Sequence, residues 1–430
     1  MLFLRSSDAD FTERFAAVVE DRREAGSDVV GDVAAILSQV KARGDAALRD
    51  YTSRFDGHDL SDEASWRYTP EQCRAAFDDL DGALRDSLQL AATRIRDYHQ
   101  GQLPQGRDYR DDAGIRLGAR WSAVDAAGLY VPGGRAAYPS SLLMNAIPAR
   151  VAGVERLVVT TPTPRGLINP LVLAAAHVAQ VDEVWRVGGA QAIAAMAYGT
   201  QRIAPVDVIT GPGNAYVAEA KRQLYGVVGI DMVAGPSEIL VIADRNNDPA
   251  WLAADLLSQA EHDPAAQAIL IADDMTFAEQ VVDAVEALLP RLATEEAARQ
   301  SWDTHGVVIV VDDLHSEAAA LANRLAAEHV ELALDEPHAL FAQLRHAGSV
   351  FLGRQTPEAV GDYIAGPNHV LPTGRRARFA SGLSVLDFMK RTSFIEVPDG
   401  ALALIGPAAA TLAHAEGLPA HARSIEIRLP

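Results

Sequence analysis

The feature that most constrains the fold is an alternation of short β-rich runs with Ala-rich helical runs between residues 128 and 274. The predicted strands are Gly128–Val131, Arg156–Thr160, Glu183–Val187, Val206–Ile209, Met232–Val233, Ile239–Ala243 and Ala268–Ala272. The predicted helices are Ser141–Val154, Pro170–Val178, Ala190–Tyr198 and Ala215–Tyr225. Such strand–helix–strand alternation is typical of parallel sheets covered by helices. The sequence therefore predicts an α/β fold.

The same alternation continues towards the C-terminus. Further strands are predicted at Val307–Val311, Val330–Leu334 and Val350–Leu352, with an amphipathic helix at Ser316–Ala327. A chain of 430 residues exceeds one ordinary hydrophobic core. We therefore expect two or more domains.

The two ends of the chain differ from this central part. Residues 1–128 are helix-rich and charged, with a 3.6-residue apolar period over residues 30–55, broken at Gly44, and again over residues 70–100. After about residue 378 the runs shorten, which predicts a small terminal domain or an arm. This tail ends in a predicted helix, Pro407–Glu416, and a predicted strand, Ser424–Leu429.

Composition excludes several classes of partner and site. A formal net charge of −20 argues against nucleic acid or an anionic membrane as the main partner. The single cysteine, Cys73, excludes an intramolecular disulfide and a cysteine-based zinc cluster, and its flanks predict a helix surface with no assigned role. The sequence has no signal-peptide pattern and no apolar run long enough to cross a bilayer. We therefore expect a cytoplasmic protein.

Four glycine-containing turns follow predicted strands. They are Tyr130-Val-Pro-Gly-Gly134, Gly188-Gly-Ala-Gln191, Gly211-Pro-Gly-Asn214 and Gly235-Pro-Ser237. Glycine allows close approach to a phosphate, and a helix that begins at such a turn offers unpaired N–H groups. Any one of these turns is explained better by ordinary turn chemistry. Four of them in one region favour a nucleotide or phosphate site, although the full dinucleotide fingerprint is absent because Tyr216 occupies the third glycine position.

A second candidate site lies at the end of a predicted helix. Asp248-Pro249 predicts its start and Asp263-Pro264 its end. Gln259 and His262 are three residues apart, so they project from one face near the C-terminal end of this helix. Alone, the pair is better explained as a hydrogen-bonded pair at a helix end, because an amide oxygen is an uncommon metal ligand. With other ligand-type residues nearby it becomes half of a metal site.

Candidate acid–base residues follow later in the chain. Glu328 and His329 are adjacent near the predicted end of a helix, where both side chains can lean into one cleft. The imidazole has the right ordinary pKa for proton transfer near neutrality, and the carboxylate is suited to activating water. A histidine at a helix C-terminus is also favoured by the helix dipole alone, and the sequence does not separate these two interpretations.

Two further segments carry ligand-type residues. Gly361–Pro372 is predicted to be a polar, aromatic loop that carries Asp362 and His369. Near the C-terminus, Glu416 and His421 flank a predicted helix end, and His414 nearby has no assigned role.

These segments together resemble the histidinol dehydrogenase family. The motifs are Tyr130-Val-Pro-Gly-Gly with Tyr138-Pro-Ser-Ser141, Gly188-Gly-Ala-Gln-Ala-Ile193, Gly211-Pro-Gly-Asn-Ala-Tyr-Val217, Ala234-Gly-Pro-Ser-Glu-Ile-Leu240, Ser258-Gln-Ala-Glu-His-Asp-Pro264, Glu328-His329, Gly366-Pro-Asn-His-Val-Leu-Pro372 and Asp387-Phe-Met-Lys-Arg-Thr-Ser393. They occur in the expected order from about residue 25 to the C-terminus. The resemblance implies oxidation of L-histidinol, through L-histidinaldehyde, to L-histidine with two NAD+, the last steps of histidine biosynthesis.

The resemblance also implies a role for each candidate residue. The zinc ligands would be Gln259, His262, Asp362 and, from the partner subunit of a homodimer, His421, a donor set that suits Zn2+. Glu328 and His329 match the catalytic pair, the histidine accepting the alcohol proton and the glutamate activating water. The positions matching further substrate contacts are Ser237, His369 and Glu416. The positions matching NAD contacts are Tyr130, Gln191 and Asn214.

For the architecture, the resemblance implies two incomplete Rossmann-like domains, one inserted in the other, with terminal pieces that exchange between the subunits of the homodimer. The implied parts are an N-terminal arm (1–24), a discontinuous α/β domain with the zinc ligands and the catalytic pair (25–128 and 239–378), an inserted NAD-binding-like domain (129–238) and a C-terminal exchange domain (379–430).

Two other functions are compatible with the same scaffold. One is a related zinc alcohol dehydrogenase that oxidises another polar alcohol, such as a sulfonated diol. The carboxylate of Glu416 suits an imidazole N–H and would repel a sulfonate, which favours histidinol. The other is a non-catalytic metal or nucleotide binder, which is disfavoured because every ligand and both catalytic positions are present.

Overall fold

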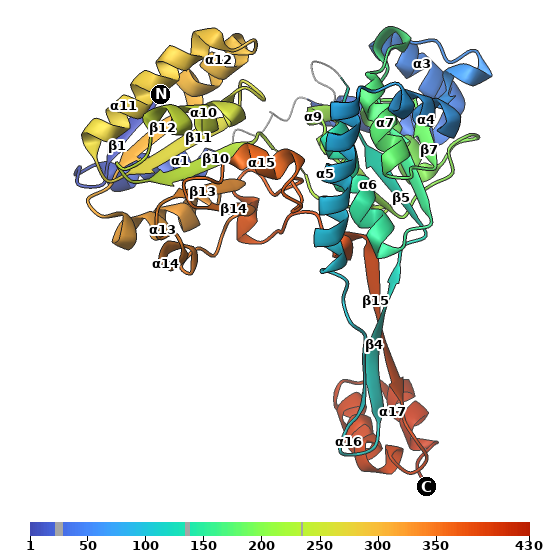
Figure 1. The fold of residues 1–430 in the computed structure, drawn as a ribbon. Coiled ribbons are helices and arrows are strands. Elements are labelled where there is room, and N and C mark those ends of the chain that lie inside the picture. The colour runs from blue at the N-terminus through green and yellow to red at the C-terminus, as the bar shows by residue number, and fades with distance from the viewer. Residues whose placement is uncertain (22–28, 134–137, 234) are drawn as a thin grey trace.

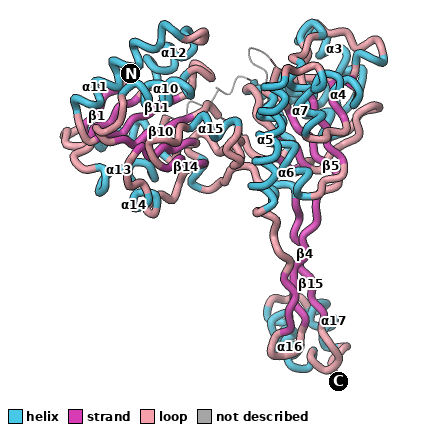
Figure 2. Tube along the Cα trace, viewed as in Figure 1, coloured by secondary structure: helices cyan, strands magenta, loops and turns pink. Residues whose placement is uncertain are grey.

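The computed structural model describes residues 1–21, 29–133, 138–233 and 235–430, which form two α/β domains and a slender arm (Figure 1). Within these ranges each domain contains a six-stranded sheet, and the arm contains a three-stranded one. Helices cover both faces of the sheet in each domain (Figure 2). Gly134, which ends the first predicted glycine turn, and the predicted domain boundary between residues 24 and 25 lie outside the described residues.

The first domain is built on the sheet order β2-β7-β6-β5-β8-β9. Its strands are β2 (Arg67–Tyr68), β5 (Ala126–Tyr130), β6 (Arg156–Thr160), β7 (Glu183–Trp185), β8 (Val208–Thr210) and β9 (Gly229–Ile230). All pairs are parallel except β2 with β7. One core lies between the sheet and α4 (Pro70–Asp78), α5 (Gly82–Gln100), α6 (Pro139–Ala152) and α7 (Pro170–Val178). The other lies beneath α2 (Val30–Arg43), α3 (Asp45–Asp56), α8 (Gly189–Tyr198) and α9 (Ala215–Leu224).

The second domain is built on the parallel sheet order β1-β12-β11-β10-β13-β14. Its strands are β1 (Leu2–Arg5), β10 (Glu238–Ala243), β11 (Gln267–Ala272), β12 (Val307–Val310), β13 (His329–Ala333) and β14 (Ser349–Leu352). Helices α1 (Phe11–Glu20), α13 (Leu314–Leu325) and α14 (His338–Phe341) lie over one core. Helices α10 (Pro249–Ala260), α11 (Met275–Leu288) and α12 (Glu295–His305) enclose the other.

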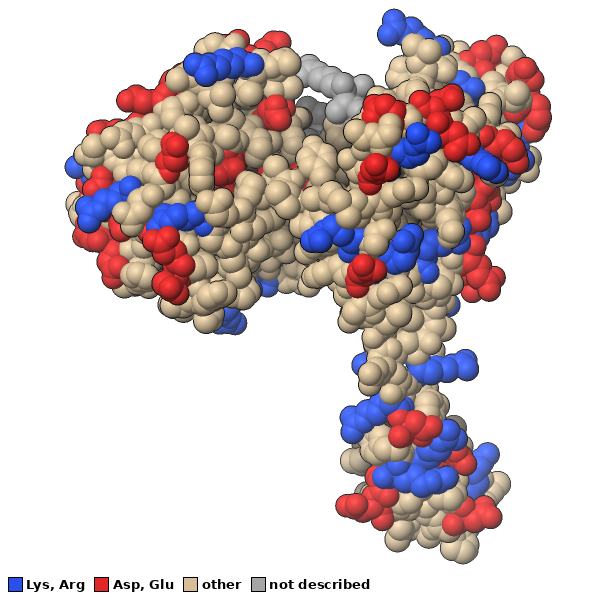
Figure 3. Space-filling view, in the orientation of Figure 1, with Lys and Arg blue, Asp and Glu red and all other residues tan. Residues whose placement is uncertain are grey.

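The arm projects from the first domain (Figure 1). Strands β3 (Arg107–Arg110), β4 (Arg116–Ala123) and β15 (Met389–Glu396) pair antiparallel, and β15 joins β4 over eight residue pairs from Met389–Ala123 to Glu396–Arg116. Helices α16 (Leu402–Ala415) and α17 (Pro419–Glu426) pack on each other at its tip. Figure 3 shows acidic and basic side chains interspersed over this face of the arm and both domains.

The central strands of the two sheets have the same relative order. In each, the chain enters at a middle strand (β5 or β10), adds two strands on one side, and then returns to add two on the other. This order creates a crevice where neighbouring connections leave in opposite directions, at the carboxyl ends of β5 and β8 and of β10 and β13.

Most of the sequence-predicted elements agree with the structure. The strands at residues 156–160 and 268–272 and the helix at Pro170–Val178 occur as predicted, to within one residue. Two predictions are wrong. Met232–Val233 follows β9 as irregular chain, and Ser424–Leu429, predicted as a strand, covers the end of α17 and the turn that follows it. Helix α17 has Pro419 in its first turn, which favours a helix start, and it packs against α16 through Ala422 and Ile425.

The packing also differs from the predicted domain division. Helices α2 to α5 contact the sheet of the first domain, because their apolar faces share cores with its strands. Strand β1 pairs with β12 of the second domain, so residues 2–20 complete a sheet instead of forming a free arm. Cys73, predicted on a helix surface, lies in α4 but is buried against α7. No helix in the described part of the chain is long and apolar enough to span a membrane.

Gly211, at the carboxyl end of β8, allows the backbones after β8 and at the end of β5 to lie very close together. Its φ is +112°, and a Cβ atom would lie 2.2 Å from the Tyr130 carbonyl oxygen. The Gly211 N–H donates to Asp231 Oδ2 (2.8 Å), and its carbonyl accepts from Lys221 Nζ (3.0 Å). The Lys221–Asp231 ion pair is fully buried, so the turn is fixed on both sides.

We expect Gly211→Ala to destabilise the protein by about 2 kcal/mol or more, because the added Cβ meets rigid backbone at a positive φ. Gly31→Ala is the matched control: Gly31 lies in α2 with open space around its would-be Cβ, and we expect it to stabilise by about 0.5–1 kcal/mol. Urea unfolding measures both changes. Equal stability of the two variants would contradict the close approach.

Candidate active site

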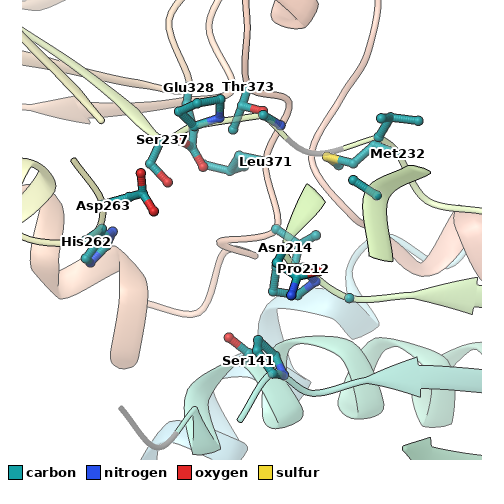
Figure 4. A pocket seen from close by; sticks show the side chains of 18 of the residues that line it. Ser141, Pro212, Asn214, Met232, Ser237, His262, Asp263, Glu328, Leu371 and Thr373 are labelled. Atoms are coloured by element: carbon teal, nitrogen blue, oxygen red, sulfur yellow. The ribbon is translucent and has the colours of Figure 1, made fainter. Parts of the chain in front are cut away.

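A cavity of about 1010 Å³ lies between the two domains, and segments of both line it. Figure 4 shows Ser237 and Glu328 on one wall, His262 to the side, and Asn214 and Ser141 across the cavity. The first domain contributes the carboxyl ends of β5 and β8. The second contributes the amino ends of β10 and β13, and therefore presents the opposite edge of its sheet.

Gln259 and His262 lie together as predicted. Asp248 caps α10 by accepting the Ala250 N–H, Pro249 occupies its first turn, and Gln259 lies in its last turn. The Gln259 Nε2 lies 3.1 Å from His262 Nδ1. Both side chains line the cavity, so an amide oxygen and an imidazole are available on the same wall.

His329 is held in one tautomer by two acceptors. Its Nδ1 lies 2.9 Å from Gln259 Oε1 and 3.2 Å from the Glu238 carbonyl oxygen. Both are hydrogen-bond acceptors, so Nδ1 carries the proton and Nε2 keeps its lone pair. Burial lowers the pKa of His329 to about 3, which keeps the imidazole neutral and able to accept a proton.

His329 begins a strand and Glu328 directly precedes it, whereas the sequence predicted a helix end for both. Helix α13 ends at Leu325, Ala326 adopts a left-handed φ of +46°, and β13 begins at His329. The Glu238 N–H donates to Glu328 Oε2 at 3.0 Å. Burial raises the pKa of Glu328 well above its ordinary value. The pair thus forms the amino end of a central strand, where both side chains reach the cavity.

Asp362 and His369 also line the cavity. The predicted loop begins instead in the short helix α15 (Glu358–Tyr363), which carries Asp362. The Nδ1 of His369 lies 2.9 Å from the Asp362 carbonyl oxygen. Burial lowers the pKa of His369 to about 4 and raises that of Asp362.

Glu358 is a site residue that the sequence analysis missed. Its Oε1 lies 3.6 Å from His329 Nε2, and its Oε2 accepts from Ser258 Oγ at 3.1 Å. Ligand atoms of His329, Glu358 and Asp362 all lie within 4.8 Å of one another. The available signal was the spacing of Glu358 and Asp362, which at i and i+4 share one helix face.

The donor set suits a bound dication. The cavity wall offers the His262 imidazole and the Asp362 carboxylate, which are common zinc ligands, and beside them the amide oxygen of Gln259. Burial raises the pKa of the Asp362 and Glu358 carboxyls, because ionised groups there lack solvation. A cation at this position would stabilise their ionised forms.

The three predicted NAD-contact residues have different environments. Asn214 lines the cavity and caps α9 by accepting the N–H groups of Tyr216 and Val217. Tyr130 and Gln191 are buried outside the cavity lining. The Tyr130 hydroxyl accepts the Gly189 N–H at 3.1 Å, and burial raises its pKa to about 12.

Glu416 and His421 do not reach the cavity of their own chain. Both are exposed, at the end of α16 and in α17, on the arm that projects away from the two domains (Figure 1). His414, which has no assigned role, lies 2.8 Å from Glu426 Oε1.

Comparisons with known proteins agree over the whole chain. A family model described as histidinol dehydrogenase matches residues 19–429. A histidinol dehydrogenase of Zymomonas mobilis is 61% identical over 429 residues, covering 100% of this chain and 99% of that one. One of Rhodospirillum rubrum is 60% identical over 428 residues, covering 100% and 98%. The crystal structure of histidinol dehydrogenase from Elizabethkingia anophelis superimposes with a TM-score of 0.94 at 34% identity, covering 100% of this chain and 98% of that one.

The buried acids beside the site predict a pH-dependent stability. Burial raises the pKa of Glu331, which is hydrogen-bonded to Asp255, from 4.5 to about 9. Between these values the folded state binds more protons than the unfolded state, so stability falls as pH rises. We expect Glu331→Gln to remove this slope and to gain at least about 2 kcal/mol over the wild type between pH 5 and pH 8.

Urea unfolding of the metal-free protein at several pH values measures this difference. Glu279→Gln, on the exposed face of α11, is the control and should keep the wild-type slope. Parallel curves for wild type and Glu331→Gln would contradict the assignment of a raised pKa to Glu331.

Proposed function

This chain belongs to the histidinol dehydrogenase family, and we propose that it oxidises L-histidinol, through L-histidinaldehyde, to L-histidine with two NAD+. These are the last two oxidations of histidine biosynthesis. The observation that carries the proposal is one cavity that joins the catalytic pair to three proposed zinc ligands.

His329 is the proposed base for the alcohol. Its Nδ1–H is held by Gln259 Oε1 and the Glu238 carbonyl, which leaves Nε2 to accept the hydroxyl proton. A neutral imidazole is required for this step, and the depressed pKa of His329 supplies it. NAD+, when bound, accepts the hydride from the substrate carbon.

Glu328 is the proposed base for the second oxidation, in which water adds to the aldehyde. The Glu238 N–H fixes one carboxylate oxygen at the cavity wall. The raised pKa makes the ionised carboxylate a stronger proton acceptor than an exposed glutamate. Once His329 has released its first proton to solvent, it can accept a hydroxyl proton of the hydrated aldehyde, and a second NAD+, when bound, would take the hydride.

The proposed zinc ligands are Gln259, His262 and Asp362, completed by the partner subunit's His421. Zinc at this position would supply a Lewis acid that anchors the substrate's amine and imidazole. Ser237 and His369, which line the cavity, and Glu416 from the second subunit are the proposed further substrate contacts. The carboxylate of Glu416 suits an imidazole N–H.

The cofactor is proposed to bind along the first domain. Its strand order and the glycine turns after β5 and β8 support an incomplete Rossmann-like unit, and the N-terminus of α9 at Asn214 faces the cavity. Asn214 would contact NAD+ from the cavity lining. Tyr130 and Gln191, also assigned to the cofactor, are buried next to the turn at Gly189.

A homodimer with exchanged arms completes the proposal. The apolar side chains of Leu404, Leu412 and Ile427 on the arm are more than 60% exposed, which favours burial against a second copy. The exchanged unit is residues 379–430 together with β3 and β4, which pair with β15. The two α/β domains follow the two sheets, so helices α2 to α5 belong with the proposed NAD-binding domain. In sequence, the first domain lies between β1 and β10 of the second, so it is inserted into the second domain.

The direct test is NADH formation by the purified protein with L-histidinol. We expect two NADH per histidinol, loss of activity on chelation, and recovery with zinc. His262→Asn should lose both zinc and activity. His315→Asn, an exposed histidine at the opposite end of the second sheet, is the control and should keep both. A folded, zinc-loaded wild type with no histidinol turnover would disprove the proposed substrate.

Shared sites predict complementation between two inactive chains. We expect His421→Ala and Glu328→Ala each to be inactive as homodimers, whereas mixed dimers regain one intact site. Activity should therefore approach about half of the wild-type value in purified hybrid dimers, since one of their two sites is intact. Absence of recovery in proven hybrids would refute a ligand donated by the second subunit.

A further inference from the structure

A buried arginine lies directly behind the proposed catalytic pair. The Arg375 side chain is 2% exposed and forms an ion pair at 3.0 Å with the fully buried carboxylate of Glu238. Its Nη2 donates to Gln267 Oε1 at 2.8 Å and to the Val18 carbonyl oxygen at 3.0 Å. One guanidinium thus joins the starts of β10 and β11 to the end of α1.

The backbone at Arg375 is unusual for its residue type. Its φ is +67°, and Gly374 before it has a φ of +61°. Glycine is the residue that adopts this conformation at low cost. An arginine in such a turn is held there by its side-chain contacts, and the turn directs the guanidinium inward.

Glu238 connects this arginine to both proposed catalytic residues. Its backbone N–H donates to Glu328 Oε2 at 3.0 Å. Its carbonyl oxygen lies 3.2 Å from His329 Nδ1. The residue that Arg375 neutralises is therefore the same residue whose peptide groups orient the carboxylate and set the imidazole tautomer.

The same loop fixes the preceding substrate-side residue. The Ser237 carbonyl accepts the Gln267 N–H at 3.0 Å, and Gln267 in turn accepts from Arg375. Thr373 Oγ1 accepts the Gly235 N–H at 2.6 Å. Thr373 and Arg375 thus fix the segment that leads into β10, the first through Gly235 and the second through Gln267.

We propose that Arg375 is a positioning residue for the reaction: by neutralising Glu238 it fixes the peptide groups that orient Glu328 and His329. This inference rests on the proposed function of that pair. Without the guanidinium, Glu238 becomes an uncompensated buried charge, and the start of β10 must move towards solvent. A shift of about 1 Å at a catalytic group lowers turnover on the order of 100-fold.

The test compares Arg375→Met with Arg354→Met. Arg354 forms ion pairs of the same kind, both at 2.7 Å, with Asp244 and Asp335 at the carboxyl ends of β10 and β13. We expect Arg375→Met to lower kcat for L-histidinol at least tenfold with the KM for NAD+ within twofold. Arg354→Met should lower the melting temperature and leave kcat within twofold, because its ion pairs lie at the far edge.

Hydrogen exchange supplies a readout independent of turnover. The peptide containing the Glu238 N–H should exchange faster in Arg375→Met and at the wild-type rate in Arg354→Met. If Arg375→Met does not fold, Glu238→Gln replaces it, since the ion pair is lost while the peptide groups remain; kcat should again fall at least tenfold. A folded Arg375→Met or Glu238→Gln protein with kcat within twofold of wild type would overturn the proposal. Wild-type protein that does not oxidise histidinol would disprove the proposed function instead, and the exchange result would still decide the positioning role.

Discussion

Buried charge at the meeting edge of the two domains is the constraint on which the site depends. Carboxylates enter this region from β10, β13 and α15, and each needs a counter-charge, a proton or a hydrogen-bond donor. Arg375 neutralises Glu238, and the Glu238 N–H is shared with Glu328. Asp362 has imidazoles near it instead: His369 Nδ1 lies 3.6 Å from its Oδ1, and burial raises the pKa of its carboxyl although His262 acts to lower it. A buried arginine thus balances the charge behind the proposed catalytic pair, whereas ligand-type side chains line the cavity itself.

The repeated sheet order does not produce two equivalent sites, because the domains present opposite edges to the cavity. The first domain offers strand carboxyl ends, where the N-terminus of α9 favours phosphate. The carboxyl ends of the second sheet face elsewhere and border a crevice of only about 200 Å³, lined by Asp244, Asp273 and Asp335 among others. This acidic lining repels a phosphate group. One topology thus supports the proposed nucleotide site in the first domain and holds the proposed acid–base residues in the second.

The parts of this architecture that sequence could predict are those set by local pattern. Helix spacing placed Gln259 beside His262, and a proline in the first turn fixed the start of α10. The prediction of a helix end at His329 was wrong, because an Ala-rich run with helical spacing continues up to this residue. The helix ends earlier, at a left-handed Ala326, and no sequence pattern indicates that conformation for an alanine. Arg375 escaped prediction for another reason: its partners Glu238 and Gln267 are more than 100 positions away. The association of α2 to α5 with the first sheet was likewise decided by shared cores and not by sequence order.

Burial shifts the pKa values of the histidines and carboxyls at the site, and these shifts determine how a cation would compete with protons for them. Burial keeps His329 and His369 neutral down to low pH, so both remain available as acceptors across the physiological range. The Asp362 and Glu358 carboxyls, in contrast, retain protons to higher pH than exposed acids. Binding of a dication requires the ionised form of such a ligand, so it must release protons from this wall. A dication at this site would therefore bind more tightly as pH rises through the carboxyl range, because the packing that buries Asp362 raises the pKa of its carboxyl.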